Sequence, residues 1–475
     1  MTSGKAKTVR CQVVVTVPLS RRAIMRYAAE ALGAAILPLT WPRLAFAAGD
    51  LSTPPTTAGM PRFYISASGN DGADGRSPQT AWATIQMANS SLPDETTLLF
   101  RRGDTFFGQL NVPFGCEVGA YGDGAKPILT MFKLLNRREG WTEQSLNVWK
   151  TDLSSPNTHD GYTGIPDANI GFLVVDGVVK PNLKFDPSEL TALWDFCCDV
   201  PNHVLYVRAP ANPTMLANDI RAAPNGNTEG GTGRVIHCAE GSNDLHDLHV
   251  TGSGGCGIGG TAPDVHLHDC LIDYVGGAVL SGYGDGMTRY GNGIEHWFNV
   301  CRWTIDNNEI AEVYDAAWSP QGRDASGGKV YWEDLTFRNN YIHDCGQTFE
   351  IWSKNSDPDS PGFVRVVFER NVCERGGYGV FSDVRPDPTV RVHLLTYALE
   401  TPVDVTIQDN VFDDAYSAYS YHLREPPVGY VTRNNEIRMK AGSRMEFQRP
   451  ETVEQAEAWR AETGRELGST ITVLP

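Results

Sequence analysis

The stretch WTIDNNEI, from Trp303 to Ile310, decides the fold because its pattern returns along the second half of the chain. The pattern reads apolar-x-apolar-x-x-Asn-x-apolar. It recurs as LTFRNNYI from Leu335, VVFERNVC from Val366, VTIQDNVF from Val405 and YVTRNNEI from Tyr430, and as VHLHDCLI from Val265 with Cys270 in the Asn position. Successive copies start 38, 32, 31, 39 and 25 residues apart. A repeat of this length predicts one structural unit that is used several times.

Apolar residues at every second position predict short strands, and an Asn at one fixed position predicts a recurring turn. A unit too small to bury its own core must stack on its neighbours, so the repeats predict a parallel β-solenoid. The turn residues then form a ladder of side-chain amides from coil to coil: Asn308, Asn340, Asn371, Asn410 and Asn435. The alternative is an antiparallel sandwich, which would need more Asn-Gly hairpin signals than the chain contains.

Residues 1–48 predict an export signal, and 49–62 a linker. The run SRRAIM from Ser20 resembles a twin-arginine motif, and it precedes an apolar stretch and Ala45-Phe46-Ala47, an Ala-x-Ala cleavage site. An ordinary secretory signal with chance paired arginines is the alternative. Both readings predict a periplasmic or secreted bacterial protein.

Charge and composition limit the partners. Without residues 1–48 the chain carries 33 basic and 56 acidic residues, a net charge of about −23. Such a surface repels nucleic acid and anionic lipid, and it disfavours a polyanionic substrate unless Ca²⁺ intervenes. No later segment has eighteen apolar residues in a row, so no membrane span is expected. Nine of the ten cysteines lie after residue 48; they contain no CxxC pair and predict buried thiols, and no zinc spacing is recognised. We expect a monomer without a metal or cofactor.

The run FYISASGNDGADG from Phe63, followed by RRGDTFF from Arg101, resembles the opening of right-handed parallel β-helix proteins of the pectate-lyase-like superfamily, which act on polysaccharides. The run AWRAETG from Ala458 resembles the closing helix of that superfamily. The resemblance implies an all-β fold, a right-handed parallel β-helix with capping helices. It also implies a carbohydrate substrate, whereas the reaction depends on the site.

The predicted organisation follows from these signals. We expect an N-terminal cap and first coils at 63–130, an inserted β-rich subdomain at 131–225, the main helix at 226–440 and a C-terminal capping segment at 441–475. The insertion is inferred because the repeat is interrupted there by strand-like runs such as GFLVVDGVV. Decorated coils are the alternative for that region.

Three carboxylates are the predicted catalytic residues. When the strands are aligned by their aromatic residues, Glu295, Ala316, Glu350 and Gly379 fall in one column, with Asp315 beside Ala316. Glu295 and Glu350 would lie two coils apart, about 9–10 Å, which approaches the spacing of inverting glycosidases. Asp315 could form a closer, retaining pair, and the sequence leaves both possibilities open. In related β-helix enzymes, Gly-Ile-Glu and Tyr-Asp phrases line the substrate face, which implies the placement of Glu295, Tyr314 and Asp315.

Aromatic and polar residues near these acids are expected to bind a sugar chain. The predicted substrate-binding residues are Trp297, Tyr314, Trp318, Arg323, Trp352, Lys354 and His296. A polysaccharide lyase or epimerase is the second hypothesis; it would draw on Arg289, Arg323, Lys329 or Lys354, and Ca²⁺ would then be possible. A non-catalytic exopolysaccharide-binding or surface protein is the third. The first choice is an exported glycoside hydrolase acting on a polysaccharide or oligosaccharide.

Overall fold

The computed structural model describes residues 59–153, 167–226, 233–280, 282, 286–354, 357–385, 387–422 and 426–475. The predicted export signal at 1–48 and most of the linker lie outside these residues. The chain divides into two units, Met1–Asp50 and Leu51–Pro475, and all that follows concerns the second. In the described part of the chain, no helix is long and apolar enough to span a membrane.

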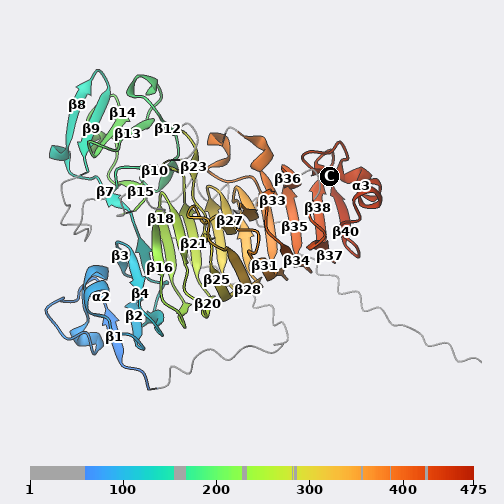
Figure 1. Ribbon diagram of the computed structural model, residues 1–475. Helices are drawn as coiled ribbons and strands as arrows, with labels where there is room; N and C mark the ends of the chain where they lie inside the picture. Colours follow the sequence, from blue (N-terminus) through green and yellow to red (C-terminus); the bar gives the residue numbers. More distant parts are fainter. Residues whose placement is uncertain are drawn as a thin grey trace, which may run out of the picture. The chain divides into compact units, whose positions relative to one another are not determined.

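Three long parallel sheets form the body of this unit, as Figure 1 shows. Sheet A contains the first strand of each repeat, and all its strand pairs are parallel. Its members in spatial order are β1 (Arg62–Ile65), β2 (Thr97–Arg101), β5 (Glu117–Tyr121), β17 (Asp244–His246), β20 (Val265–His268), β25 (Val300–Asp306), β28 (Tyr331–Arg338), β31 (Gly362–Glu369), β34 (Val403–Gln408) and β37 (Tyr430–Arg433).

Sheet B follows sheet A in each coil, after the Asn turn. Its members are β3 (Thr105–Phe107), β6 (Ile128–Thr130), β18 (His249–Ser253), β21 (Leu271–Val275), β26 (Glu309–Val313), β29 (Tyr341–His343), β32 (Val372–Gly376), β35 (Val411–Ala415), β38 (Glu436–Lys440) and β40 (Thr470–Leu474).

Sheet C completes the coil. Its members are β4 (Leu110–Val112), β16 (Arg234–Cys238), β19 (Cys256–Gly260), β24 (Ile294–His296), β27 (Ala316–Gly322), β30 (Gln347–Ser353), β33 (Val392–Leu399), β36 (Ser417–Tyr421) and β39 (Arg444–Glu446). Each chain segment therefore passes A, B and C in turn and pairs with the next coil. The predicted all-β parallel β-helix is confirmed.

The predicted ladder forms in the turn between sheets A and B. The side-chain carbonyl of each ladder Asn accepts from the backbone N–H at the same position one coil earlier, at 2.9 Å throughout; that position is Cys270 for Asn308 and an Asn for the others. The residue before each Asn has a left-handed backbone, with φ between 53° and 58°. Asn and Asp tolerate this conformation best, and they fill four of those five preceding positions. At the far end, Ser469 and Glu466 take over the bonds of Asn435.

The core inside the coils is aromatic and aliphatic. Trp318 stacks on Phe337 with ring centroids 4.9 Å apart, and Phe337 stacks on Phe368 at 5.2 Å. Such stacks continue between coils because equivalent positions repeat at the strand spacing. The cysteines of the described chain are all free, and most of them are buried as small apolar residues.

Between β6 and β16 the chain builds two small sheets with largely antiparallel pairing. They contain β7 (Lys133–Leu134), β8 (Trp141–Ser145), β9 (Val148–Asp152), β10 (Ile170–Val175), β11 (Val178–Lys180), β12 (Leu183–Lys184), β13 (Phe196–Asp199), β14 (Val204–Arg208) and β15 (Ile220–Pro224). A separate apolar cluster, which includes Trp141, Phe196 and Leu205, holds them together. The inserted β-rich subdomain is thus a unit with its own core.

Short helices lie near the two ends of the solenoid (Figure 1). They are α2 (Ile85–Ser91), which Thr84 caps, and α3 (Ala456–Thr463), which ends at Gly464 with φ 67°. The remaining elements are the hairpin β22 (Ala278–Val279) and β23 (Arg289–Tyr290), and the 3₁₀ turns η1 (Pro78–Thr80), η2 (Arg138–Gly140), η3 (Pro187–Glu189), η4 (Pro213–Met215), η5 (Ser382–Val384), η6 (Pro388–Val390) and η7 (Val453–Gln455). The capping helices complete the predicted fold class.

Candidate active site on sheet C

Glu295 and Glu350 occupy one column on sheet C. Glu295 on β24 pairs with Ser319 on β27, and the pairing of Trp318 with Phe349 puts Ser319 opposite Glu350 on β30. The two acids are therefore separated by two strand spacings, about 9–10 Å between their Cα atoms. The sequence alignment placed these two residues correctly relative to each other.

The intermediate coil differs from the sequence alignment. Ser319, not Ala316, lies between the two acids, because the true register of β27 is shifted by three residues. Gly379 does not share the column either: it lies in the connection after β32, and Leu395 on β33 pairs with Glu350. The side-chain hydroxyl of Ser319 is buried and finds no hydrogen-bond partner among the described residues. A polar group without a partner at this place can serve a ligand or a water molecule.

Glu350 is a buried carboxyl group, with 4% of its surface exposed. Burial raises the pKa of Glu350 well above its ordinary value, and the charges of Asp315 and Glu295 raise it further, whereas Arg385 opposes the shift. The protonated form of Glu350 is therefore favoured to a higher pH than in an ordinary glutamate. A carboxyl group with a raised pKa is the kind of group that serves as a general acid.

Asp315 lies at the start of β27 and forms an ion pair with Arg385, with 2.7 Å between Oδ1 and Nη1. Arg385 also donates to the backbone carbonyl of Tyr314 and lies over its ring, 4.8 Å from the centroid. Tyr314 has a second cation, Arg289, on its ring at the same distance. Tyr314 is 3% exposed, so its ring packs against the Arg385 guanidinium and does not contact solvent.

Glu295 has a cationic neighbour of its own. The Arg234 guanidinium lies 3.7 Å from Oε2 of Glu295. This oxygen is buried and accepts no hydrogen bond from the described residues. Gly259 precedes Glu295 in the column, and a side chain there would clash with the backbone carbonyl oxygen of Glu295 and approach the Arg234 guanidinium at 3.3 Å. The glycine thus lets β19 lie close to both β24 and the Arg234–Glu295 ion pair.

A row of mostly aromatic side chains runs beside the acidic column, two residues further along the strands; on β27 this position is Gln321. Trp297 is 37% exposed and lies 5.9 Å from Trp352 between ring centroids. Tyr397 on β33 follows, and its ring lies 4.7 Å from that of His422. Glu350 and Asp315 raise the pKa of Tyr397 after the larger effect of burial, so its phenol lies near both acids. Partly exposed rings in a line offer flat apolar surfaces along the solenoid axis.

Two predicted substrate contacts lie in the core instead. Trp318 and His296 have no exposed surface, and the Trp318 indole N–H donates to Nδ1 of His296 at 3.3 Å. Desolvation lowers the pKa of His296 to about 3, so the ring is neutral. Side chains alternate between the two faces of a strand. His296 follows the outward Glu295 and Trp318 precedes the outward Ser319, so both point inward. The expectation that they contact a sugar is corrected on this ground.

The predicted cations divide into two groups. Arg323 and Lys354, together with Lys329, are exposed on the connections between sheets C and A. Arg289 is structural, since it donates to the backbone carbonyls of Gly277 and Gly171. Sequence reasoning missed Arg234, Arg385 and Tyr397. Arg234 and Tyr397 lie on strands of sheet C, whereas Arg385 lies in the connection between β32 and β33. Contacts across the coils, which leave no sequence signal, make them neighbours of the acids.

Comparisons with known proteins identify no family: no family model and no curated protein matches the chain. Solved structures with a similar fold include XylC in complex with xylose, at 11% identity and a TM-score of 0.47, which covers 81% of this chain. The chain spans 64% of the XylC chain.

A GH136 lacto-N-biosidase from Eubacterium ramulus is 11% identical, with a TM-score of 0.34, and covers 87% of this chain and 68% of its own. An alginate lyase from Paenibacillus is 10% identical, with a TM-score of 0.36, and covers 87% of this chain and 99% of its own. Likenesses this distant do not identify the reaction of this chain.

Proposed function

We propose that the chain is an exported carbohydrate-active enzyme, a glycoside hydrolase that cleaves a polysaccharide or oligosaccharide lying along sheet C. The observation that carries the proposal is the acidic column: two carboxyl groups, two strand spacings apart, with the unpartnered Ser319 hydroxyl between them. With Cα atoms about 9–10 Å apart, the two side chains can hold their carboxyl groups at the roughly 6.5–9.5 Å that leaves room for a water molecule in inverting glycosidases.

The roles follow from the surroundings of each acid. Glu350, which burial keeps protonated, gives its proton to the oxygen of the leaving sugar. Glu295, which is paired with Arg234, takes a proton from the attacking water on the opposite side of the bond. Asp315 with Arg385 supports the raised pKa of Glu350 through its negative charge. Trp297, Trp352 and Tyr397 stack on successive sugar rings.

A neutral sugar chain fits the charges better than an acidic one. The chain has a strongly negative net charge, and the two arginines at the acids, Arg234 and Arg385, already form ion pairs with carboxylates. A lyase needs a cation to neutralise the substrate carboxylate, so the alternative lyase reaction would depend on the exposed Arg323 and Lys354. A hydrolase of neutral glycans is therefore the reaction that we favour.

The test is a product assay with a panel of polysaccharides. A hydrolase produces reducing ends without new absorbance near 230 nm, whereas a lyase produces about one unsaturated, absorbing end per cut, and a binding protein produces neither. Glu350→Gln should lower the rate on the order of 10²–10⁴-fold and leave substrate binding in place. Glu309→Gln, an outward carboxyl on sheet B, is the matched control and should keep the wild-type rate.

Two further readouts define the roles. Because the raised pKa keeps Glu350 protonated, activity should be present at lower pH and fall as the pH rises through that pKa. Inversion of the anomeric configuration, measured by NMR on fresh product, would support Glu295 as base; retention would transfer the second role to Asp315. If Glu295→Gln and Glu350→Gln keep near-normal rates while Lys354→Ala or Arg323→Ala abolishes activity, the hydrolase assignment is wrong.

A further inference from the structure

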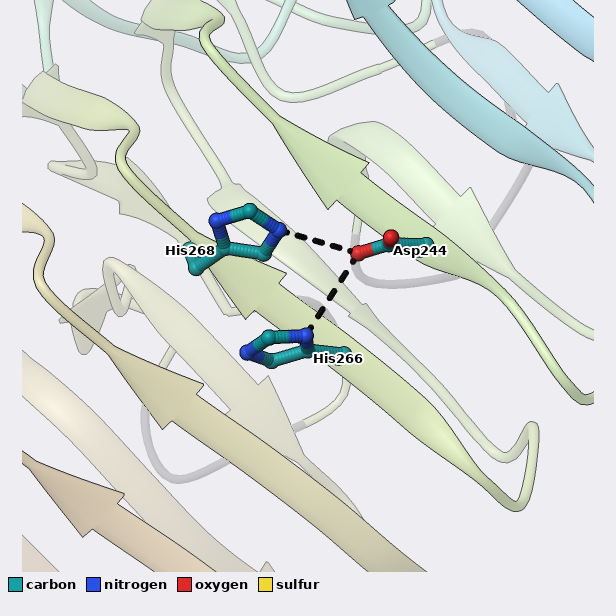
Figure 2. Close-up of side chains that lie close together, drawn as sticks. All are labelled: Asp244, His266 and His268. Atoms are coloured by element: carbon teal, nitrogen blue, oxygen red, sulfur yellow. Dashed lines mark hydrogen bonds and ion pairs between the residues drawn. The ribbon is translucent and has the colours of Figure 1, made fainter. Parts of the chain in front are cut away.

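A second group of chemically active side chains lies on sheet A, outside the acidic column of sheet C. Asp244 on β17 pairs in register with His266 on β20, and His268 is two residues further along the same strand. All three are partly exposed, with 15–23% of each side chain accessible. Figure 2 shows the two imidazoles converging on one carboxylate from the neighbouring coil.

The distances suit a metal ion. Nε2 of His268 lies 3.1 Å, and Nδ1 of His266 lies 3.6 Å, from the same oxygen, Oδ1 of Asp244. One ligand atom from each residue can be chosen so that all lie within 4.8 Å of one another. A tetrahedral zinc ion with bonds of about 2.0–2.1 Å holds its ligand atoms roughly 3.3 Å apart. Small side-chain rotations bring the three atoms to that separation.

The outer nitrogens of both histidines are already held by further carboxylates. Nδ1 of His268 lies 2.8 Å from Asp269, and Nε2 of His266 lies 3.0 Å from Asp306. Asp306 is itself within 3.4 Å of Arg338. A carboxylate behind each imidazole fixes the tautomer that leaves the inner nitrogen free to bind a metal, and such partners accompany most metal-bound histidines.

Among the described residues, three other histidines that form ion pairs do not share this arrangement. His249 pairs with Asp273, His246 lies between Glu117 and Asp247, and His343 lies between Glu309 and Asp344, so none has a second imidazole on the same oxygen. These are ordinary ion pairs between coils. At Asp244, two ring nitrogens approach one carboxylate oxygen, and the two imidazole rings lie 4.2 Å apart between centroids. Three potential ligand atoms are thus gathered around one point.

We propose that Asp244, His266 and His268 bind a divalent transition-metal ion of the zinc type, which joins two neighbouring coils of sheet A. Imidazole ligands favour zinc, nickel or copper over calcium and magnesium, which prefer oxygen. The partial exposure of the three side chains leaves a coordination position for water.

The experiment uses the complete secreted chain without a polyhistidine tag, stripped by a chelator and titrated with ZnCl₂. Calorimetry should show one zinc per chain. Co²⁺ in its place should give the visible absorption of a four-coordinate site. His268→Ala should abolish both signals, whereas His343→Ala, the matched control, should retain them. No zinc binding by the wild-type chain, or unchanged binding by His268→Ala, would overturn the proposal.

A second variant tests the zinc site if His268→Ala folds poorly. Asp269→Asn preserves the left-handed backbone at this position, where φ is 51°, because Asn tolerates that conformation. It removes the negative charge behind His268 and should weaken zinc binding about 10–100-fold without lowering the stoichiometry. An affinity equal to that of the wild-type chain would contradict the assigned role of Asp269 and the site built on it.

Discussion

Replacing Asn340 by Leu tests the ladder that holds the coils together. The Asn340 side chain is 1% exposed and takes part in four hydrogen bonds. Its Nδ2 donates to the backbone carbonyl of Ile305 and to Oδ1 of Asn371, each at 3.1 Å. Its Oδ1 accepts from the backbone N–H of Asn308 at 2.9 Å and from Nδ2 of Asn308 at 3.0 Å. Leucine has a similar volume and can form none of these bonds.

The loss of unfolding free energy caused by Asn340→Leu can be estimated from the individual hydrogen bonds. The buried N–H of Asn308 loses its acceptor, and an orphaned buried donor costs about 1–3 kcal/mol. Nδ2 of Asn308 still reaches the carbonyls of Leu267 and Asp306, and Oδ1 of Asn371 still accepts from the backbone of residue 340, so those losses are smaller. The total destabilisation should be about 2–4 kcal/mol.

Each coil contacts chiefly its neighbours. The substitution should therefore lower the stability of the whole chain and also increase local opening in the coils next to residue 340. Hydrogen exchange followed by mass spectrometry should show faster exchange in the peptide that contains Asn308, together with a lower midpoint in urea. Asn202→Leu, on the surface of the inserted subdomain, is the matched control and should change stability by no more than about 0.5 kcal/mol. An unchanged midpoint and unchanged protection at Asn308 would refute the role of the ladder.

Three other predictions follow from the same structure. Trp352→Ala should raise KM about tenfold with little change in kcat, since one stacked ring is worth roughly 1–1.5 kcal/mol; equal losses in both parameters would contradict a binding role. Although burial lowers the pKa of His343, Asp344 and Glu309 raise it to about 9, so its stabilising charge is present below pH 6.5 and lost as the pH rises through 9; His343→Gln should flatten the stability profile across that window. Arg21→Lys with Arg22→Lys should retain the precursor in the cytoplasm, and continued export would indicate the general secretory route.

The fold could be predicted because one physical requirement recurs in every coil. The turn between sheets A and B needs a left-handed residue followed by an amide that bonds the next coil, and this requirement leaves a visible Asn at a fixed position. The connections from sheet C back to sheet A carry no such constraint, so their lengths vary and their ends were not predictable. The inserted subdomain was inferred only because the repeat pattern is interrupted between residues 131 and 225. Its strand pairing depends on contacts within its own apolar cluster, and the sequence there contains no repeat from which those contacts could be predicted.

The site shows where sequence reasoning reached its limit. Aligning strands by their tryptophans matched Trp297 with Trp318, although Trp297 is 37% exposed and Trp318 is fully buried. Side chains alternate between the two faces of a strand, so a shift by three residues exchanges inward and outward positions. The correct alignment follows the bulky inward residues Ile294, Trp318 and Phe349, and it brings Ser319 between the acids.

That correction bears on the mechanism. Two intervals of backbone pairing set the Cα separation of Glu295 and Glu350, and the rotamers of the two side chains then set the distance between their carboxyl groups. The identity of the residue between them can change without moving either acid. Ser319 can hold a water molecule through its hydroxyl, which an Ala in the same place could not do. Water placement can therefore be varied at Ser319 while strand pairing keeps the backbone positions of the proposed acid and base unchanged.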